Sequence, residues 1–233
     1  MTSSFSARIV GRFPLLGLDG ASFLAAHVGP AWFHGRLAIL RADATELALV
    51  DPTTGDVGRV PLSPPASNLE LGGCFTIERE GRPFLVAFGA HYVFTLRFTA
   101  PRMPQMRIVP WSPREVRAVT RSSGGVVRLF GEASTCDLAL EPLLAELDDA
   151  DAVTTRPTAM ATYELGEDAF LGASACGDEV FFLAGQRLGV LDPTRFATLE
   201  DLRLPALGLA IEPTNRRRAY VLTSEELLTI DLA

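Results

Sequence analysis

Four acidic residues have the chemical type and the placement that acid–base catalysis requires. Asp19, Glu70, Glu115 and Asp168 each lie in a segment that leads into a run rich in small residues. Two carboxylates on opposite sides of a glycosidic bond can hydrolyse it, one as general acid and the other as base or nucleophile. The same four carboxylates could instead form a rim that attracts a cationic partner. No nucleophile elbow, phosphate-binding loop or dinucleotide-binding fingerprint accompanies them, which disfavours catalysis.

A second acidic group lies in residues 141–168, a long stretch that interrupts the strand pattern of the chain. Leucines at helical spacing predict one or two helical turns near its start. Four acidic residues lie among and just after them: Glu146, Asp148, Asp149 and Asp151. This segment is predicted to be a docking loop for another protein. The alternative is a solvated connection, because a run of charges usually faces water.

The remaining residues that could bind a metal are scattered. His27 precedes the predicted inner strand of the first repeat, His34 lies at the first hairpin of that repeat, and His91 lies at a hairpin of the second. They do not converge, so they do not predict a metal centre, and no cofactor is expected. The three cysteines are widely spaced and form no CxxC pair, which favours small buried side chains in a reducing compartment over a disulfide scaffold. They are Cys74, Cys136 and Cys176.

Composition excludes further classes of function. The 21 basic residues are all arginine, so Schiff-base and phosphate-loop chemistry that depends on lysine is excluded. The formal charge of −7 disfavours binding to nucleic acid or to an anionic membrane. Near the N-terminus, Pro14, Gly17 and Asp19 interrupt the apolar residues, so no signal peptide is predicted. No segment is long and apolar enough to span a bilayer, and a cytoplasmic protein is expected.

A strand–turn–strand unit at residues 45–62 shows how the chain must be built. The apolar run ELALV leads into DPTTGD and a returning strand. Proline presets φ in such a turn, and Gly55 accepts a positive φ. A weaker copy, with DPT at the same place, occupies residues 187–204.

One strand type recurs five times along the chain and predicts a repeat fold. The copies begin at Arg36, Arg82, Val126, Glu179 and Arg217, which are 46, 44, 53 and 38 residues apart. A period of about 47 residues matches one four-stranded propeller blade. We therefore predict an all-β fold, a five-bladed β-propeller that forms a single domain over residues 1–233.

The neighbours of each copy complete the predicted blades. Runs rich in small residues precede the copies and predict inner strands at residues 28–33, 72–78, 116–122, 171–177 and 207–213. More polar outermost strands are expected at residues 58–62, 105–111 and 199–205. Blade three breaks this pattern, because LLAELDD stands where its fourth strand should be.

The fifth blade is one strand short, and the N-terminal segment supplies a strand without a blade. Residues 6–15 are therefore predicted to pair with residues 226–232. This pairing would close the ring and leave no apolar strand edge exposed.

The turns ALVDPTTGDV and GVLDPTRFAT resemble the repeats of YVTN-type and quinoprotein-like β-propellers, in which a strand that ends in Asp is followed by Pro or a small residue and then Gly. The resemblance covers two repeats well and the others by pattern. It implies the propeller fold and leaves function open, because propellers serve as enzymes, lectins and scaffolds.

The favoured hypothesis is a non-enzymatic propeller that binds another protein. It would act as a scaffold or accessory subunit of a bacterial multi-protein assembly, including assemblies that contain an ATPase. The alternative is a glycosidase-like hydrolase with a carboxylate-lined channel mouth.

Overall fold

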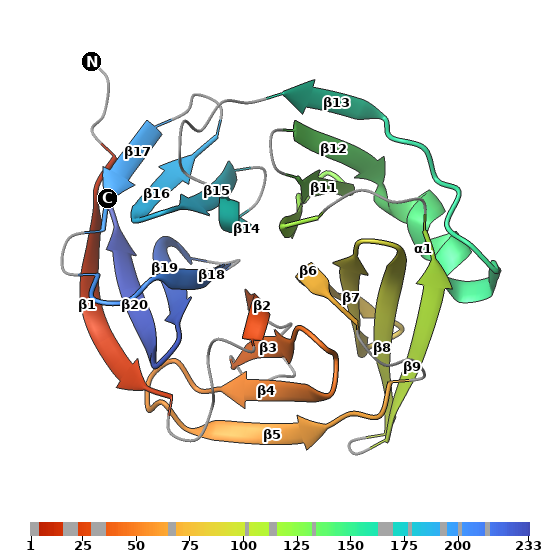
Figure 1. Ribbon diagram of the computed structural model, residues 1–233, viewed down its shortest axis with the longest axis horizontal. Coiled ribbons are helices and arrows are strands. Elements are labelled where there is room, and N and C mark those ends of the chain that lie inside the picture. Colours follow the sequence, from red (N-terminus) through yellow and green to blue (C-terminus); the bar gives the residue numbers. More distant parts are fainter. Residues whose placement is uncertain are drawn as a thin grey trace.

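The computed structural model describes residues 5–15, 23–28, 36–64, 69–100, 103–111, 116–131, 134–162, 170–176, 179–191, 195–199, 202–212 and 215–233. Five antiparallel sheets of four strands each form a ring (Figure 1). The innermost strands of neighbouring sheets contact one another all the way around the centre. The chain is thus a five-bladed β-propeller, as the sequence predicts.

The five blades follow the chain in order, and each is listed here from its innermost strand outward. Blade one contains β2 (Phe23–Val28), β3 (Leu37–Arg41), β4 (Glu46–Val50) and β5 (Val57–Pro61). Blade two contains β6 (Leu71–Arg79), β7 (Arg82–Gly89), β8 (Tyr92–Ala100) and β9 (Met103–Pro110). Blade three contains β10 (Ala118–Arg121), β11 (Val126–Phe130), β12 (Ser134–Ala139) and β13 (Ala159–Thr162), with the helix α1 (Leu140–Asp149) between its last two strands. Blade four contains β14 (Phe170–Cys176), β15 (Glu179–Ala184), β16 (Arg187–Val190) and β17 (Arg195–Thr198). Blade five contains β18 (Ala206–Glu212), β19 (Asn215–Thr223), β20 (Glu226–Leu232) and, outermost, β1 (Ala7–Pro14).

The hydrophobic core lies between the blades. Among the described residues, buried side chains form five clusters, and each joins two neighbouring blades. In β3, Ala38 and Leu40 pack against blade two, whereas Leu37 and Ile39 pack against blade five. All four are fully buried, because this strand is covered on both faces. The unbroken apolar runs of the sequence are explained by this double covering.

The turn in residues 51–56 has the predicted chemistry. The Asp51 carboxylate accepts hydrogen bonds from the Thr53 N–H at 2.8 Å and the Thr53 hydroxyl at 2.6 Å. The hydroxyl of Thr53 contributes most to lowering the pKa of Asp51. Gly55 has a φ of +78°, and its N–H donates to the Asp51 carbonyl at 2.8 Å. The equivalent turn at residues 192–194 lies outside the described residues.

The predicted closure of the ring is confirmed. Strand β1 pairs antiparallel with β20, with Ala7 opposite Leu232 and Pro14 opposite Glu226. Ser6 and Ala233 extend the pairing by two backbone hydrogen bonds of 2.9 and 3.0 Å. In Figure 1 the N-terminal strand lies on the outer side of β20. One sheet therefore contains strands from both ends of the chain.

Two predicted strand positions are wrong, and a third strand has no counterpart in the prediction. The inner strand of blade one is β2, which ends at Val28, where the predicted strand would begin. The fourth strand of blade four is β17, upstream of the predicted residues 199–205. Blade three does have a fourth strand, β13, but all its described side chains are exposed and it carries no apolar alternation that would reveal it. The segment LLAELDD belongs instead to α1, which is longer than the one or two turns expected.

In the described part of the chain, we find no helix with the length and apolar character that crossing a bilayer would require.

Candidate functional site

The predicted carboxylate rim is only partly visible. Glu70 is exposed just before β6, and its backbone N–H donates to the hydroxyl of Tyr92. Asp19, Glu115 and Asp168 lie outside the described residues. No pair of rim carboxylates can therefore be placed, and the rim stays a prediction.

The residues considered for metal binding lie apart from one another. His27 falls within β2, rather than before the inner strand of blade one, and His91 lies in the turn between β7 and β8. His34 lies outside the described residues. Where side chains are described, no group of three His, Cys, Asp or Glu residues is close enough to hold a metal ion.

The cysteines are free thiols. Cys74 and Cys136 are buried and Cys176 is half-buried. Burial raises the pKa of the Cys74 thiol to about 12, so this group is unreactive at neutral pH.

The predicted docking loop is an ordered insertion in blade three. After β12, the chain enters α1 because leucines recur at helical spacing and all face the same side. These leucines are buried in the core cluster between blades two and three: Leu140, Leu143, Leu144 and Leu147. Beyond the helix, Val153 pairs with Trp111, and the Trp111 ring meets Phe88 edge-on at 5.4 Å between ring centres. The insertion is thus fixed to blade two as well as to its own blade.

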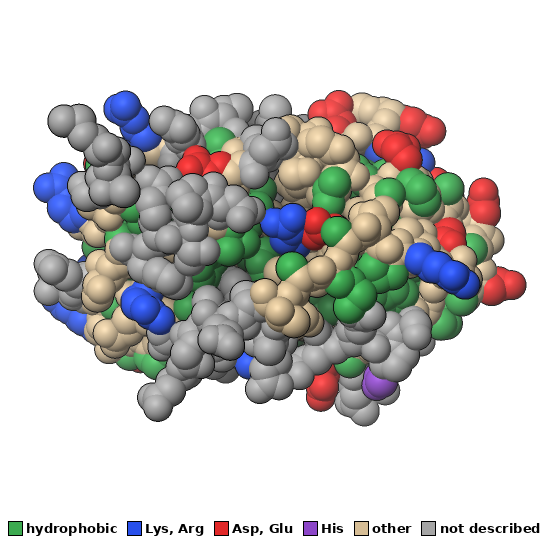
Figure 2. Space-filling view, turned by 90° about the horizontal axis from the view of Figure 1, so that it is seen from above, with side chains coloured by type: hydrophobic (Ala, Val, Ile, Leu, Met, Phe, Trp, Pro, Cys, Tyr) green, Lys and Arg blue, Asp and Glu red, His purple; other side chains and the backbone are tan. Residues whose placement is uncertain are grey.

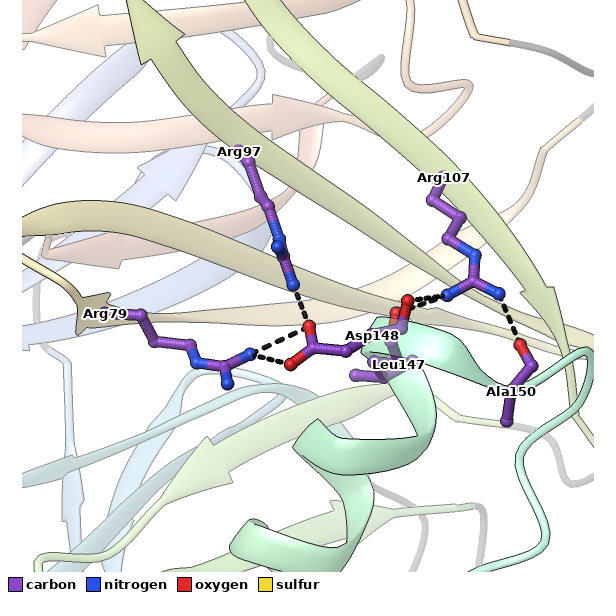
Figure 3. A network of polar contacts seen from close by, with 6 residues as sticks. All are labelled: Arg79, Arg97, Arg107, Leu147, Asp148 and Ala150. Atoms are coloured by element: carbon purple, nitrogen blue, oxygen red, sulfur yellow. Dashed lines mark hydrogen bonds and ion pairs between the residues drawn. The ribbon is translucent and has the colours of Figure 1, made fainter.

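The end of α1 is anchored by arginines of blade two (Figure 3). The Asp148 carboxylate lies between Arg79, at the end of β6, and Arg97, in β8. One nitrogen of Arg79, Nη1, donates to both carboxylate oxygens at 2.7 and 2.9 Å. Nη2 of Arg97 forms an ion pair with Oδ1 of the same carboxylate. A single aspartate thus bridges two strands of blade two to a helix of blade three.

A third arginine caps the backbone of the same helix end. Arg107, in β9, donates through Nη1 to the carbonyl oxygens of Leu147, at 2.8 Å, and Asp148. Its Nη2 donates to the carbonyl of Ala150. The last carbonyls of a helix have no partners within the helix, and a cation there is favourable to the helix dipole. Arg107 therefore stabilises the end of α1 by both effects.

A pocket of about 140 Å³ lies beside the Asp148 network. Phe84 forms part of its lining, and the guanidinium carbons of Arg97 and Arg79 lie 4.8 and 5.7 Å from the centre of the Phe84 ring. Loss of hydration, and then the charge of Arg79, lower the pKa of Arg97. The lining residues are Arg79, Glu80, Arg82, Pro83, Phe84, Arg97, Phe98, Gln105 and Asp148. We call this hollow the arginine pocket.

The acidic residues of the insertion divide into two groups. Glu146 faces its own loop, where its carboxylate accepts hydrogen bonds from the N–H and hydroxyl groups of both Thr154 and Thr155. Asp149 and Asp151 are exposed. Figure 2, an edge-on view of the disc, shows acidic side chains gathered on the right, the side on which α1 lies in Figure 1. Of the four residues predicted for docking, Glu146 and Asp148 therefore have internal partners, and the other two face solvent.

The Glu146 contacts predict a pH-dependent stability. Burial alone would raise the pKa of Glu146, but the hydrogen bonds from Thr154 and Thr155 outweigh it and lower the pKa. A lowered pKa stabilises the fold fully above the unfolded-state value of about 4.3, and this contribution is lost as the pH falls through the folded-state pKa. We expect Glu146→Gln to lower the free energy of unfolding at neutral pH by about 1 kcal/mol, because the carboxylate remains partly hydrated.

Urea denaturation of both proteins between neutral pH and about pH 3 measures this difference, which should shrink as the carboxylate is protonated. The exposed Asp151→Asn variant is the matched control, and its effect should be small at every pH. A Glu146→Gln effect that is the same at both ends of the range would contradict the assignment.

Comparison with known proteins identifies the fold. No protein-family model matches the chain, and no curated protein matches its sequence. The solved structure of the PQQ-bound form of aldose sugar dehydrogenase from Streptomyces coelicolor superimposes with a TM-score of 0.57 and 12% identity, over 99% of each chain. Selenomethionine-substituted virginiamycin B lyase from Staphylococcus aureus superimposes with a TM-score of 0.53 and 9% identity, over 99% of this chain and 100% of that one. A gluconolactonase from Xanthomonas campestris gives a TM-score of 0.50 at 10% identity, over 86% of this chain and 69% of that one. At these identities the likeness shows the fold alone: the chain is a five-bladed β-propeller structurally similar to propellers of several different activities.

Proposed function

We propose that the protein is a non-enzymatic β-propeller that binds another protein through the insertion in blade three. The supporting observation is a group of ordered, exposed acidic side chains that make no hydrogen bond or ion pair to the described residues. Glu141, Asp149 and Asp151 are exposed, whereas the neighbouring Glu146 and Asp148 are held by internal partners. We call the three exposed residues the acidic face.

The acidic face is a fixed surface rather than a mobile tail. Glu141, Ala145 and Asp149 are spaced four residues apart on α1, so they lie on one side of the helix, and all three are exposed. Beneath them, the leucines and the three arginines of blade two hold the helix in place. A surface that is already ordered loses little entropy when it binds a partner.

Asp149 supports a role outside the fold. It lies in the last turn of α1, where an acidic side chain interacts unfavourably with the helix dipole. Its charge favours the protonated form of Arg97 but is unfavourable to the helix dipole. The partner that this surface suits is a protein with a complementary basic patch, because opposite charges speed and orient association. Membership of a bacterial multi-protein assembly, including one with an ATPase, is part of this proposal.

The proposal is tested by affinity capture from the native organism, followed by mass spectrometry. We expect the wild-type chain to retain a specific partner that the triple variant Glu141→Gln, Asp149→Asn, Asp151→Asn loses. A second triple variant removes the same number of negative charges from exposed residues of blades one and five and should retain the partner. Its substitutions are Asp56→Asn, Glu225→Gln and Asp231→Asn.

Both triple variants should melt close to the wild type, because exposed substitutions usually change stability little. The expected reduction in partner recovery is about tenfold or more, since several charged contacts are removed together. Equal recovery with both triple variants, or no partner for the wild-type chain, would overturn the proposal.

A further inference from the structure

The arginine pocket contains hydrogen-bond donors that the fold leaves unused. A guanidinium group carries five N–H donors. Only Nη1 of Arg79 donates to Asp148, and only Nη2 of Arg97 donates to the same carboxylate. Neither side chain makes a further hydrogen bond to the described residues, and their side chains are 36% and 44% exposed. Donors therefore remain for a ligand beside Asp148.

The balance of charge in the pocket favours an anion. Three arginines, Arg79, Arg82 and Arg97, line it with the two acids Glu80 and Asp148. Guanidinium groups held close together repel one another, and the pKa of Arg97 is lowered by loss of hydration and by the charge of Arg79. A bound anion would relieve this repulsion.

The geometry of the pocket is prepared for such a ligand. The Phe84 ring lies beneath both Arg79 and Arg97 and limits the orientations of their planar groups. The volume of about 140 Å³ is below the roughly 300–1,000 Å³ of pockets for drug-sized ligands, so it suits one small group. Asp148 already provides a planar carboxylate to these arginines. A tetrahedral group presents oxygens in several directions, so it can accept hydrogen bonds from several of the arginines that line the pocket.

We propose that the arginine pocket binds a phosphate group through Arg79, Arg82 and Arg97, next to the Asp148 carboxylate. The group would be either inorganic phosphate or the phosphoryl group of a phosphorylated protein. The proposal is independent of the acidic face and of its partner.

Because Asp148 lies beside the proposed phosphate site, two substitutions are expected to change phosphate affinity in opposite directions. Arg97→Gln removes donors and a positive charge, so phosphate affinity should fall about tenfold, the size expected for a charge-assisted hydrogen bond. Asp148→Asn removes the competing negative charge and frees both arginines, so phosphate affinity should rise, by at least about threefold. An ordinary loss of structure would weaken binding in both variants.

Isothermal titration of the full chain with inorganic phosphate, at fixed ionic strength, measures these changes. Arg59→Gln is the matched control: Arg59 forms an ion pair with Glu46 at 3.4 Å in blade one, and its side chain is 45% exposed. It removes the same charge as Arg97→Gln from a similarly exposed position, and phosphate affinity should not change. If Arg97→Gln does not fold, Arg82→Gln replaces it, because Arg82 lies exposed at the start of β7.

A phosphoserine peptide, titrated beside its unphosphorylated form, distinguishes the two sources of the group. Tighter binding of the phosphopeptide than of inorganic phosphate, dependent on Arg97, identifies a phosphoprotein ligand. Equal affinity for the phosphopeptide and for inorganic phosphate identifies the free ion. No binding of either probe, or phosphate binding that Arg97→Gln and Arg59→Gln weaken alike, would overturn the proposal.

Discussion

A chain that lacks residues 1–15 is expected to aggregate or to remain unfolded. These residues supply β1, whose removal would leave the apolar strand β20 with an open edge. Leu15 is buried, and Ile9 and Phe13 pack against the core clusters of blade five. Burying such side chains is worth about 1.5–3 kcal/mol each. One fully buried and two half-buried side chains therefore contribute several kcal/mol, a large part of the net stability of a domain, about 5–15 kcal/mol.

The measurement is a thermal melt together with the oligomeric state in solution. Removal of residues 1–4 leaves β1 intact and should leave the melting temperature unchanged. Val10→Ser is a second control within the strand, because Val10 is 51% exposed. A chain without residues 1–15 that stays monomeric and melts like the full chain would show that β1 does not close the ring.

Gly72→Ala is expected to disrupt the junction between blades two and three. Gly72 is the extra residue of a bulge at the start of β6, where the register to β7 shifts. A Cβ at this position would overlap the backbone carbonyl of Val116, far inside the 3.0 Å that real Cβ atoms keep from other atoms. Because that obstacle is backbone on the neighbouring blade, the two blades would have to separate. We expect a loss of more than about 4 kcal/mol, in the range reserved for severe strain.

Chemical denaturation of Gly72→Ala and Gly58→Ala provides the comparison. A Cβ at Gly58 would lie 3.3 Å from Nη1 of Arg36, the far end of a flexible side chain that can move aside. The Gly58 variant should therefore lose little stability. Similar stability losses in the two variants would mean that the inner strands are free to shift, contrary to the close contact seen here.

The repeat and its closure could be predicted because they depend on local patterns. Buried strands such as β3 and β7 are apolar at consecutive positions, and this follows from their covering on both faces. The sequence leaves blade five one strand short and leaves residues 6–15 as a strand without a blade, so their pairing could be inferred. Where the pattern is weak the prediction fails: the four residues of β13, AMAT, are all exposed, and no apolar–polar alternation marks them as a strand.

The arginine pocket could not be predicted in the same way. Arg79, Arg97 and Asp148 lie far apart in the sequence, and only the packing of α1 on blade two brings them together. The sequence shows an acidic run at residues 146–151, but it does not separate the acidic residues that have internal partners from those that face solvent. Glu146 has internal partners only because the chain turns back after α1 and places Thr154 and Thr155 beside its carboxylate.

The pairing of β1 with β20 also sets the order in which the disc can assemble. Four of the five sheets are built from strands consecutive in sequence, which can form as local hairpins. The fifth needs Arg12 beside Glu226, a separation of 214 residues. Contacts so distant along the chain carry a large entropy of loop closure and slow the folding reaction. Newly made chains should therefore pass through an open crescent of blades, and its exposed end strand would stay vulnerable to other chains until the first strand arrives.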